Sequence, residues 1–509
     1  MKILVRGVNW IGDAMMTTPA LRQLRRHLPN ASISLVLRPW LVPLFSNNPD
    51  IDEVIAYGDE FRGVRGRLQF AKELTARRFD MAVLFQNAID AAIITWLAQI
   101  PKRIGYSTDV RGFLLTTAIK GKRKDPGQHH VYYYLELLKK GLAIDYNDPE
   151  MVLVPGYDVR KKAKKLLTSF EPHCTYTIGI NPGATYGSAK RWMPERFAVV
   201  ADRAVEKLNG RVILFGSKQE APIAEAIIRA MKHKALNMVG NTDLPLLSAF
   251  LYMCDAMVTN DSGPMHMAAA LNTPVVAVFG STNSVATGPF GKGHRVVKKE
   301  MPCSPCLERV CSNGSLACMD AISAEEVSEA LDSVIFGKKA VFFDRDGTLI
   351  RDAHYLNSFD NFYIFPDAKS SLNRLDEAGF MLIGVSNQSG IARGIVDEEF
   401  VRQCHKALIE KLPIEAFYFC PHHPDDRCTC RKPEIGLLKK AALVHGLDLK
   451  KSYVVGDKES DILLAKAVSS KGVLISTGQE QSSSHADYIV SSLTEAADWI
   501  LKDYENTSN

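Results

Sequence analysis

Two aspartates that stand two residues apart, directly after an apolar stretch, have the types and spacing needed for phosphoryl transfer. They are Asp344 and Asp346 in AVFFDRDGT. One carboxylate can attack phosphorus, while the second protonates the leaving oxygen and later activates water. Because two negative charges repel a phosphate dianion, we expect Mg²⁺, which prefers oxygen ligands, to bind beside them.

Further polar residues follow other apolar stretches in the last third of the chain. Asp457 and Asp461 in VVGDKESD are expected to complete the shell of the Mg²⁺ ion. Ser386 and Asn387 at the end of GVSN offer donors to phosphate oxygens, and the Arg-Lys pair at 431–432 supplies positive charge. The order of these motifs resembles the haloacid dehalogenase superfamily of aspartyl-phosphate phosphatases. The alternative is a set of acidic turns without catalysis.

Three cysteines and a histidine lie between these motifs, in CPHHPDDRCTCRKP. Cys420, His422, Cys428 and Cys430 form a ligand set suited to tetrahedral Zn²⁺ with no open position. Such an ion would be structural and would hold the loop that carries the Arg-Lys pair. Two alternatives stay open: His423 takes the place of His422, or the thiols remain reduced without a metal.

In finer detail this region resembles the D-glycero-D-manno-heptose 1,7-bisphosphate phosphatases, through DRDGTLIRDAHYL, DNFYIFPDA, SNQSGIARG, CPHHP, CRKP and VVGDKESD. The resemblance implies Asp344 as nucleophile, Asp346 as acid and base, and Mg²⁺ held by Asp344, the main-chain carbonyl of Asp346, and Asp457. The substrate contacts it implies are Arg345, Asp352, His354, Tyr355, Ser386, Asn387, Gln388, Ser389, Arg393, Arg431, Lys432 and Lys458. The short metal loop approaches the spacing of the histidinol phosphatases, so a histidinol-phosphate phosphatase is the alternative, although NQSGIARG favours the heptose enzymes.

In the front part of the chain, a glycine and an acid stand in the loop expected between the first strand and its helix. They are Gly12 and Asp13 in RGVNWIGDAMM. An inverting sugar transferase needs one base to deprotonate the acceptor hydroxyl as it attacks the anomeric carbon. Asp13 fits that role; alternatively, it only caps the following helix.

Two later segments suit a diphosphate leaving group. Lys190 in NPGATYGSAKRW stands between an expected strand and helix, where a cation can neutralise a departing diphosphate. In VTNDSGPMHMAAAL, Asp261, Ser262 and Gly263 end a strand and precede a helix whose amino terminus suits a pyrophosphate. His266 follows in the first turn, where a histidine is more often structural.

These segments, together with VILFGS, resemble the heptosyltransferases of glycosyltransferase family 9, especially the lipopolysaccharide heptosyltransferase II type. The resemblance implies a GT-B fold, ADP-L-glycero-β-D-manno-heptose as donor, and a heptosylated inner core of lipid A as acceptor. Asp13 would be the base, Lys190 the diphosphate partner, and Asp261 to Gly263 with His266 the donor-site residues. The alternatives are another family 9 sugar transferase or a non-catalytic glycan-binding scaffold, against which intact Asp13 and Lys190 argue.

The elements that must position these residues are short apolar strands alternating with amphipathic helices, a pattern typical of parallel sheets covered on both faces. The first strand is expected over Lys2 to Val8, with its helix from about Ala20. We expect an α/β chain with two Rossmann-like domains of a GT-B fold, residues 1–168 and 169–337, that share a cleft. A HAD-like Rossmannoid phosphatase domain is expected over 338–509.

Length and charge agree with this division. The 509 residues suggest about three domains at roughly 150 residues each. The formal charge of +5 is uneven, because residues 1–170 hold 26 Lys+Arg against 16 Asp+Glu. This excess favours an anionic partner, which could be a phosphorylated or acidic glycan, an anionic membrane surface or nucleic acid. The resemblance to family 9 implies the acidic, membrane-borne glycan, and we expect no nucleic acid. The candidate contacts are Arg62, Arg65, Arg67, Lys120, Lys122, Arg123 and Lys124, unless these charges only form a solvated face.

Apolar runs are too short for a membrane span of about 18 residues or for a secretory signal before Arg6. We therefore expect a cytoplasmic protein without a transmembrane segment, in peripheral contact with the inner membrane. A second thiol cluster, Cys303, Cys306, Cys311 and Cys318, lacks histidine and regular spacing. It either binds a metal or consists of loop thiols, and we assign it no catalytic role.

Overall fold

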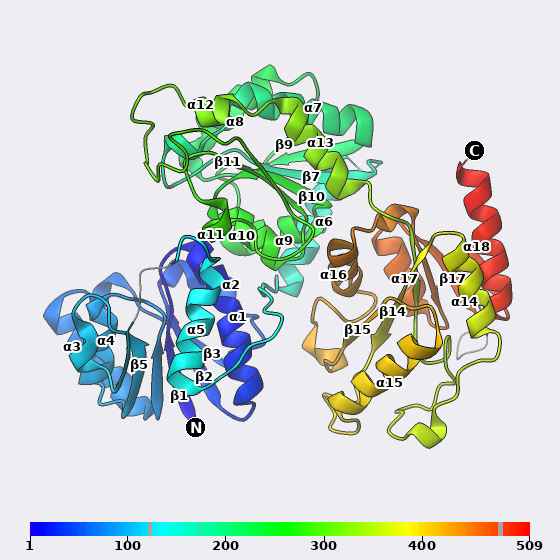
Figure 1. The fold of residues 1–509 in the computed structure, drawn as a ribbon, viewed down its shortest axis with the longest axis horizontal. Coiled ribbons are helices and arrows are strands. Elements are labelled where there is room, and N and C mark those ends of the chain that lie inside the picture. The colour runs from blue at the N-terminus through cyan, green and yellow to red at the C-terminus, as the bar shows by residue number, and fades with distance from the viewer. Residues whose placement is uncertain (121–124, 172, 477–481, 509) are drawn as a thin grey trace. The chain divides into compact units, whose positions relative to one another are not determined.

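The computed structural model describes residues 1–120, 125–171, 173–476 and 482–508. The chain divides into two compact units, Met1–Val334 and Ile335–Asn509. Across the described residues, the strands form three parallel sheets of six strands each, flanked by helices (Figure 1). The predicted α/β class with doubly wound sheets is therefore confirmed.

The first sheet of the first unit has the order β3-β2-β1-β4-β5-β6. Its strands are β1 Lys2–Arg6, β2 Ser32–Leu37, β3 Glu53–Ala56, β4 Met81–Leu84, β5 Lys102–Tyr106 and β6 Thr117–Ile119. The order changes direction at β1, since β2 pairs on one side of it and β4 on the other. Ligands of open parallel sheets bind beyond the carboxyl ends of the strands at such a point.

The second sheet of the first unit has the order β12-β11-β10-β7-β8-β9. Its strands are β7 Tyr176–Asn181, β8 Gly210–Leu214, β9 Leu236–Asn237, β10 Ala256–Asn260, β11 Val275–Phe279 and β12 Arg295–Lys298. The central strands β7 and β10 are buried throughout, as expected for strands covered by helices on both faces.

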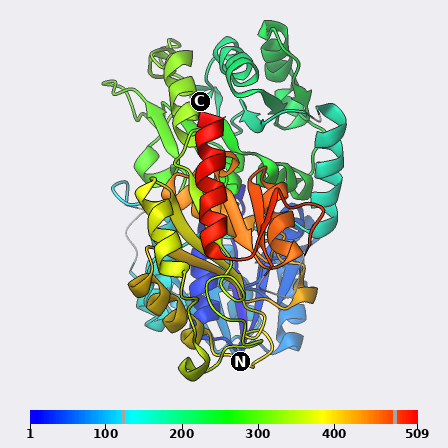
Figure 2. The ribbon, with the colours of Figure 1, turned by 90° about the vertical axis from the view of Figure 1, so that its right-hand side faces the viewer.

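The sheet of the second unit has the order β15-β14-β13-β16-β17-β18. Its strands are β13 Ala340–Phe343, β14 Met381–Asn387, β15 Ala416–Cys420, β16 Tyr453–Gly456, β17 Lys471–Ile475 and β18 Tyr488–Val490. The buried strand β13 lies between β14 and β16, so the loops that follow these three strands meet at one edge. Helices α14 and α18 pack side by side on this unit (Figures 1 and 2).

The helices alternate with these strands along the chain. In the first unit they are α1 Ile11–His27, α2 Val42–Phe45, α3 Gly63–Arg77, α4 Ile89–Leu97, α5 His130–Leu142, α6 Tyr157–Phe170, α7 Pro194–Leu208, α8 Ala221–Ala230, α9 Leu244–Met253, α10 Gly263–Ala270, α11 Ser284–Thr287, α12 Ala317–Asp320 and α13 Ala324–Ile335. In the second unit they are α14 Ala368–Glu377, α15 Glu398–Lys411, α16 Gly436–His445, α17 Glu459–Ala467 and α18 Leu493–Ser508. Within the described parts of the chain, none of the helices combines the length and the apolarity that crossing a bilayer requires.

Helix α1 begins earlier than predicted, at Ile11 instead of about Ala20. Pro19 lies inside the helix and cannot donate to the carbonyl of Met15, but the hydroxyl of Thr18 donates to that oxygen at 2.7 Å. Asp13 therefore lies in the first turn of α1 and not in a loop. The residue at the cap position is Trp10.

Candidate functional sites

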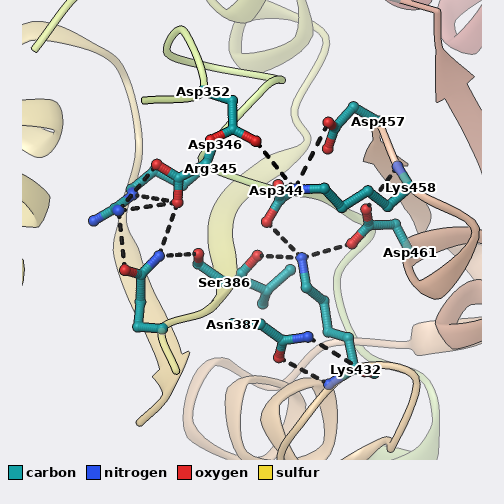
Figure 3. Close-up of polar contacts among 12 residues, drawn as sticks. Asp344, Arg345, Asp346, Asp352, Ser386, Asn387, Lys432, Asp457, Lys458 and Asp461 are labelled. Carbon is teal, nitrogen blue, oxygen red and sulfur yellow. Dashed lines mark hydrogen bonds and ion pairs between the residues drawn. The ribbon is translucent and has the colours of Figure 1, made fainter. Parts of the chain in front are cut away.

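Three buried aspartates meet at the carboxyl edge of the sheet in the second unit (Figure 3). Asp344 follows β13, Asp457 follows the neighbouring strand β16, and Asp461 lies in the first turn of α17. One oxygen from each carboxylate lies within 4.8 Å of the others. This edge thus concentrates three negative charges in a buried place.

The carboxylate of Asp457 is the least compensated of the three. Both of its oxygens are buried without a hydrogen-bond partner among the described residues. Burial and the neighbouring charge of Asp344 raise the pKa of Asp457 to about 7, and burial also raises the pKa of Asp344. Gly347 has a positive φ of 89°, and a side chain there would meet Asp457 at 2.3 Å, which accounts for glycine after Asp346. A buried pair of acceptor oxygens without a donor fits a hard divalent cation.

Lys432 supplies the positive charge at this edge. Its Nζ atom lies 2.5 Å from Oδ1 of Asp344 and 2.6 Å from Oδ1 of Asp461 (Figure 3). Although burial opposes the charge, the two carboxylates raise the pKa of Lys432, so it stays protonated. The side chain of Asn387 holds the lysine in place: its Oδ1 accepts from Lys432 N at 3.0 Å and its Nδ2 donates to Lys432 O at 3.2 Å. Both ends of the Asn387 amide, which we predicted as a phosphate contact, are thus engaged with the backbone of Lys432.

The carboxylate of Asp346 is held by two neighbours (Figure 3). Arg345 donates to it from Nε and Nη2, both at 3.0 Å, and Gln388 donates from Nε2 at 2.8 Å. Gln388 Nε2 also lies 2.7 Å from Ser386 Oγ, to which it donates. Arg345 is almost fully buried. We predicted Arg345 and Gln388 as substrate contacts, but the structure engages both with Asp346.

The other predicted substrate residues of this unit lie on loops around the same edge. Lys458 Nζ is 3.4 Å from Asp352 Oδ2 and 3.9 Å from Asp457 Oδ2. The remaining ones are exposed His354, Tyr355 and Arg393, and half-buried Ser389 and Arg431. Nη1 of Arg431 is buried without a partner in the described chain. Of these residues, Lys458, Arg393 and Arg431 bring positive charge to the loops around the aspartate cluster.

The predicted thiol site is assembled. Ligand atoms of Cys420, His422, Cys428 and Cys430 all lie within 4.8 Å of one another, with His422 Nδ1 3.4 Å from Cys420 Sγ and 3.1 Å from Cys430 Sγ. His423 is used differently, because its Nδ1 accepts from the backbone N–H of Asp425. Three sulfurs and one imidazole nitrogen at this spacing suit tetrahedral Zn²⁺.

In the first unit, α1 and α10 bring the two sheets' loops together. Gly12 on α1 faces the ring of His266 on α10, so closely that a Cβ atom at position 12 would lie 2.8 Å from His266 Cδ2. The half-buried Asp13 accepts a hydrogen bond from the hydroxyl of buried Tyr134 at 3.3 Å. Burial raises the pKa of Tyr134, so it stays a neutral donor. Burial also lowers the pKa of His266 to about 4.

The predicted diphosphate residues lie in the loops after β7, β10 and β11. Lys190 Nζ is 2.5 Å from Asp261 Oδ2, and that oxygen also accepts from the hydroxyl of Thr282 at 2.7 Å. Ser262 precedes α10, which begins at Gly263. The structure thus brings Lys190, Asp261, Ser262 and Gly263 to the carboxyl edge of the second sheet.

A pocket of about 680 Å³ opens where the strands β1 to β4 end. Its lining includes four arginines, Arg6, Arg38, Arg62 and Arg67, and the exposed indoles of Trp10 and Trp40. Buried Arg6 Nε, Asn9 Oδ1 and Gln86 Oε1 have no hydrogen-bond partner in the described chain, and all three residues line this pocket. The unsatisfied donor Arg6 Nε and the arginine lining suit an anionic group, whereas the two amide oxygens can only accept hydrogen bonds, for example from hydroxyl groups of a ligand.

Only part of this pocket could be predicted from the sequence. Arg62 and Arg67 line it, whereas Arg65 and Lys120 are exposed elsewhere, and residues 122–124 lie outside the described residues. Arg6 was missed, although a charged residue at the end of an apolar strand was a usable signal. Tyr134 and Thr282 were not predicted either, because nothing in the sequence around them marks them as partners of Asp13 and Asp261. Of the second thiol cluster, Cys303 and Cys306 are exposed and Cys318 is buried.

Two family models match the chain. Glycosyltransferase family 9 (heptosyltransferase) matches residues 67–317, and a HAD-hydrolase-like family matches residues 429–496. Lipopolysaccharide heptosyltransferase 2 of Salmonella typhimurium is 34% identical over 314 residues, which cover 58% of this chain and 88% of that protein. The D-glycero-beta-D-manno-heptose-1,7-bisphosphate 7-phosphatase of Haemophilus ducreyi is 35% identical over 180 residues, which cover 32% of this chain and 99% of that protein.

Solved structures resemble the chain as well. The E. coli ADP-heptose LPS heptosyltransferase II superposes with a TM-score of 0.57 and 28% identity, over 65% of this chain and 98% of that one. A family 9 glycosyl transferase from Veillonella parvula gives a TM-score of 0.60 and 26% identity, over 65% and 96%.

Proposed function

Since the chain belongs to glycosyltransferase family 9 in its first unit and to the HAD-type heptose bisphosphate phosphatases in its second, we propose that one protein carries out two reactions of lipopolysaccharide core synthesis. The first unit transfers heptose, with inversion, from ADP-L-glycero-β-D-manno-heptose to the heptosylated inner core of lipid A. The second unit removes the 7-phosphate of D-glycero-D-manno-heptose 1,7-bisphosphate.

The phosphatase proposal rests on the buried carboxylate of Asp457 beside Asp344. In the described chain its oxygens accept no hydrogen bond, and its ion-pair partner, Lys458 Nζ, is as far away as 3.9 Å. With Asp344 and the main-chain carbonyl of Asp346, it would hold Mg²⁺. The ion would neutralise the charge between the nucleophile and the incoming phosphate. A phosphoryl-transfer site of this kind requires a bound cation, whereas a set of acidic turns without catalysis does not.

The chain's own residues then carry the steps. An oxygen of Asp344 attacks phosphorus and forms an aspartyl phosphate, while Asp346 gives its proton to the departing sugar oxygen. Asp346 next takes a proton from water, which attacks phosphorus and releases Asp344. Lys432 orients Asp344 and offsets its charge, and Asn387 keeps the peptide of Lys432 in position.

Zn²⁺ in the thiol site would be structural, because three cysteines and His422 fill a tetrahedral shell. The site immediately precedes Arg431 and Lys432 in the chain. The ion would therefore hold the loop that delivers both cations to the aspartates.

For the transfer reaction, Asp13 takes the proton of the acceptor hydroxyl as its oxygen attacks the anomeric carbon. Lys190 and the amino terminus of α10 neutralise the departing ADP. The contact of Gly12 with His266 supports this assignment, because it brings the turn that carries Asp13 against the helix that follows Asp261.

The arginine pocket would take the acceptor. Its four guanidinium groups suit the acidic groups of an inner core, and its exposed indoles offer stacking surfaces for sugar rings. Because that acceptor is anchored in a membrane, we further propose that the protein works in the cytoplasm, at the surface of the inner membrane.

A two-part assay on the full-length chain tests the proposal. We expect phosphate release from heptose 1,7-bisphosphate, and mass spectrometry should find one added heptose on a heptosylated core acceptor supplied with ADP-heptose. Turnover of histidinol phosphate with none of the heptose bisphosphate would reject the phosphatase assignment. Binding of the core acceptor without transfer would instead support a non-catalytic scaffold.

A further inference from the structure

We propose that Arg345, Gln388 and His405 are positioning residues that hold the carboxylate of Asp346 in one orientation, and that Arg345 is not a ligand of the substrate. His405 comes from α15, a helix that none of the assigned site residues occupies. This inference rests on the proposed phosphatase function, within which Asp346 is the acid and base.

Two of the three guanidinium nitrogens of Arg345 already donate to protein acceptors. Its Nε and Nη2 atoms donate to the two oxygens of Asp346, and Nη2 also donates to Gln388 Oε1 at 3.0 Å. The side chain is 2% exposed. A guanidinium buried to this degree cannot reach a phosphate without giving up these bonds, so its fork determines where Asp346 points.

His405 lies beside Nη1, the guanidinium nitrogen of Arg345 that contacts neither Asp346 nor Gln388. Its Nε2 atom is 3.5 Å from Nη1 of Arg345. The ring stacks on Phe417, with centroids 4.6 Å apart and planes 4° apart, and leans on Phe419 at 5.3 Å. Burial and the charge of Arg345 lower the pKa of His405 to about 3, so the ring is neutral and its Nε2 accepts a hydrogen bond. The stacking on Phe417 thus holds His405 Nε2 as an acceptor for Arg345, and this contact keeps the guanidinium oriented toward Asp346.

Gln388, which directly follows β14, is the third residue that supports Asp346. Its amide oxygen accepts from Arg345, so the amide nitrogen must face Asp346, to which it donates at 2.8 Å. Asp346 thus receives donors from two side chains that also bind each other. A catalytic carboxylate displaced by about 1 Å can lose roughly 100-fold in rate, which makes such a support consequential.

The test compares His405→Phe, which keeps a stacking ring without an acceptor, with His405→Gln, which restores an acceptor. In the full-length chain, we expect His405→Phe to lower kcat by about 10- to 100-fold with KM within about 2-fold, and His405→Gln to recover much of the loss.

Phe417→Leu removes the stacking partner but keeps the imidazole. It should lower thermal stability, and it should lower kcat less than His405→Phe does, because the acceptor is loosened but not lost. Wild-type kcat in His405→Phe would overturn the inference. A raised KM with unchanged kcat in Arg345→Lys would also overturn it, because that result would make Arg345 a substrate ligand. Arg345→Lys also serves if His405→Phe does not fold. The same variants are also assayed with p-nitrophenyl phosphate. This substrate reports on the phosphatase site even if the proposed sugar substrate is wrong.

Discussion

Asp457 lies within 4.8 Å of Asp344 at the ends of neighbouring strands, with both of its carboxylate oxygens buried and, in the described chain, without a hydrogen-bond donor. Lys432 bonds to Asp344 and Asp461 but is not bonded to Asp457. Lys458 Nζ lies 3.9 Å from Asp457 Oδ2, beyond hydrogen-bond distance. The protein therefore binds two of the three buried carboxylates directly with Lys432 and leaves the oxygens of the third available to a metal cation.

Removal of metal should make the second unit sensitive to pH. The pKa of Asp457 is raised to about 7 in the folded chain, against about 4 when unfolded, so the folded state binds the extra proton between these values. The free energy of unfolding should consequently fall as pH rises from about 4 to about 7 in EDTA. Urea unfolding of the full-length chain, followed with and without Mg²⁺, measures this.

Asp457→Asn provides the control. It removes the titrating group, so this fall with pH should be smaller in EDTA, and Mg²⁺ should stabilise the variant less than the wild type. Phosphatase activity should drop by at least about 100-fold. Equal stabilisation of wild type and variant by Mg²⁺ would contradict a metal role for Asp457.

A methyl group at position 12 should impair transfer. Gly12→Ala places a Cβ atom 2.8 Å from His266 Cδ2, so α1 and α10 must separate and Asp13 must move relative to the donor loops. We expect heptosyl transfer to fall by about 10-fold or more. Phosphate release by the same protein is the internal control and should be unchanged; undiminished transfer would show that this contact does not set the position of Asp13.

The arginine pocket predicts a split between the two transfer substrates. Arg38→Ala should raise the KM for the core acceptor by about 10-fold and leave the KM for ADP-heptose unchanged, because the pocket lies on the first sheet and Lys190 on the second. Arg65→Ala is the matched control, since this exposed arginine does not line the pocket. If both variants raised the KM for the core acceptor equally, the change would reflect the overall charge of the protein and not binding in the pocket.

The thiol site predicts one equivalent of tightly bound zinc in the second unit. Cys430→Ser should lose that equivalent and most phosphatase activity, because the loop that carries Lys432 loosens. Cys404→Ser alters a buried thiol outside the site and should keep the zinc. Elemental analysis and phosphate release on the two variants check this; full activity in zinc-free protein would contradict the structural role.

The sequence predicted those features that depend on local pattern. The positions of Asp344 and Asp457 at strand ends could be predicted, because each directly follows a short apolar run of the kind that forms a buried parallel strand. The start of α1 could not, because Gly12 and Pro19 argue against a helix. The packing of α1 on both α5 and α10, and the hydrogen bond from the Thr18 hydroxyl to the carbonyl of Met15, compensate for them.

The partners of individual side chains were beyond the sequence for a related reason. Arg345 and Asn387 carry groups that suit phosphate equally well as they suit a carboxylate or a peptide. Which partner each takes depends on the tertiary position of Asp346 and Lys432, and on His405, which no motif marks.

The central claim is that two separate active sites share this chain, and a crossed pair of variants tests it most directly. Full-length Asp13→Asn should lose at least about 100-fold in heptosyl transfer and retain phosphate release from heptose bisphosphate, whereas Asp344→Asn should do the reverse. Both activities are measured on the same preparations. Loss of both reactions in either folded variant, or of neither in both, would contradict the account.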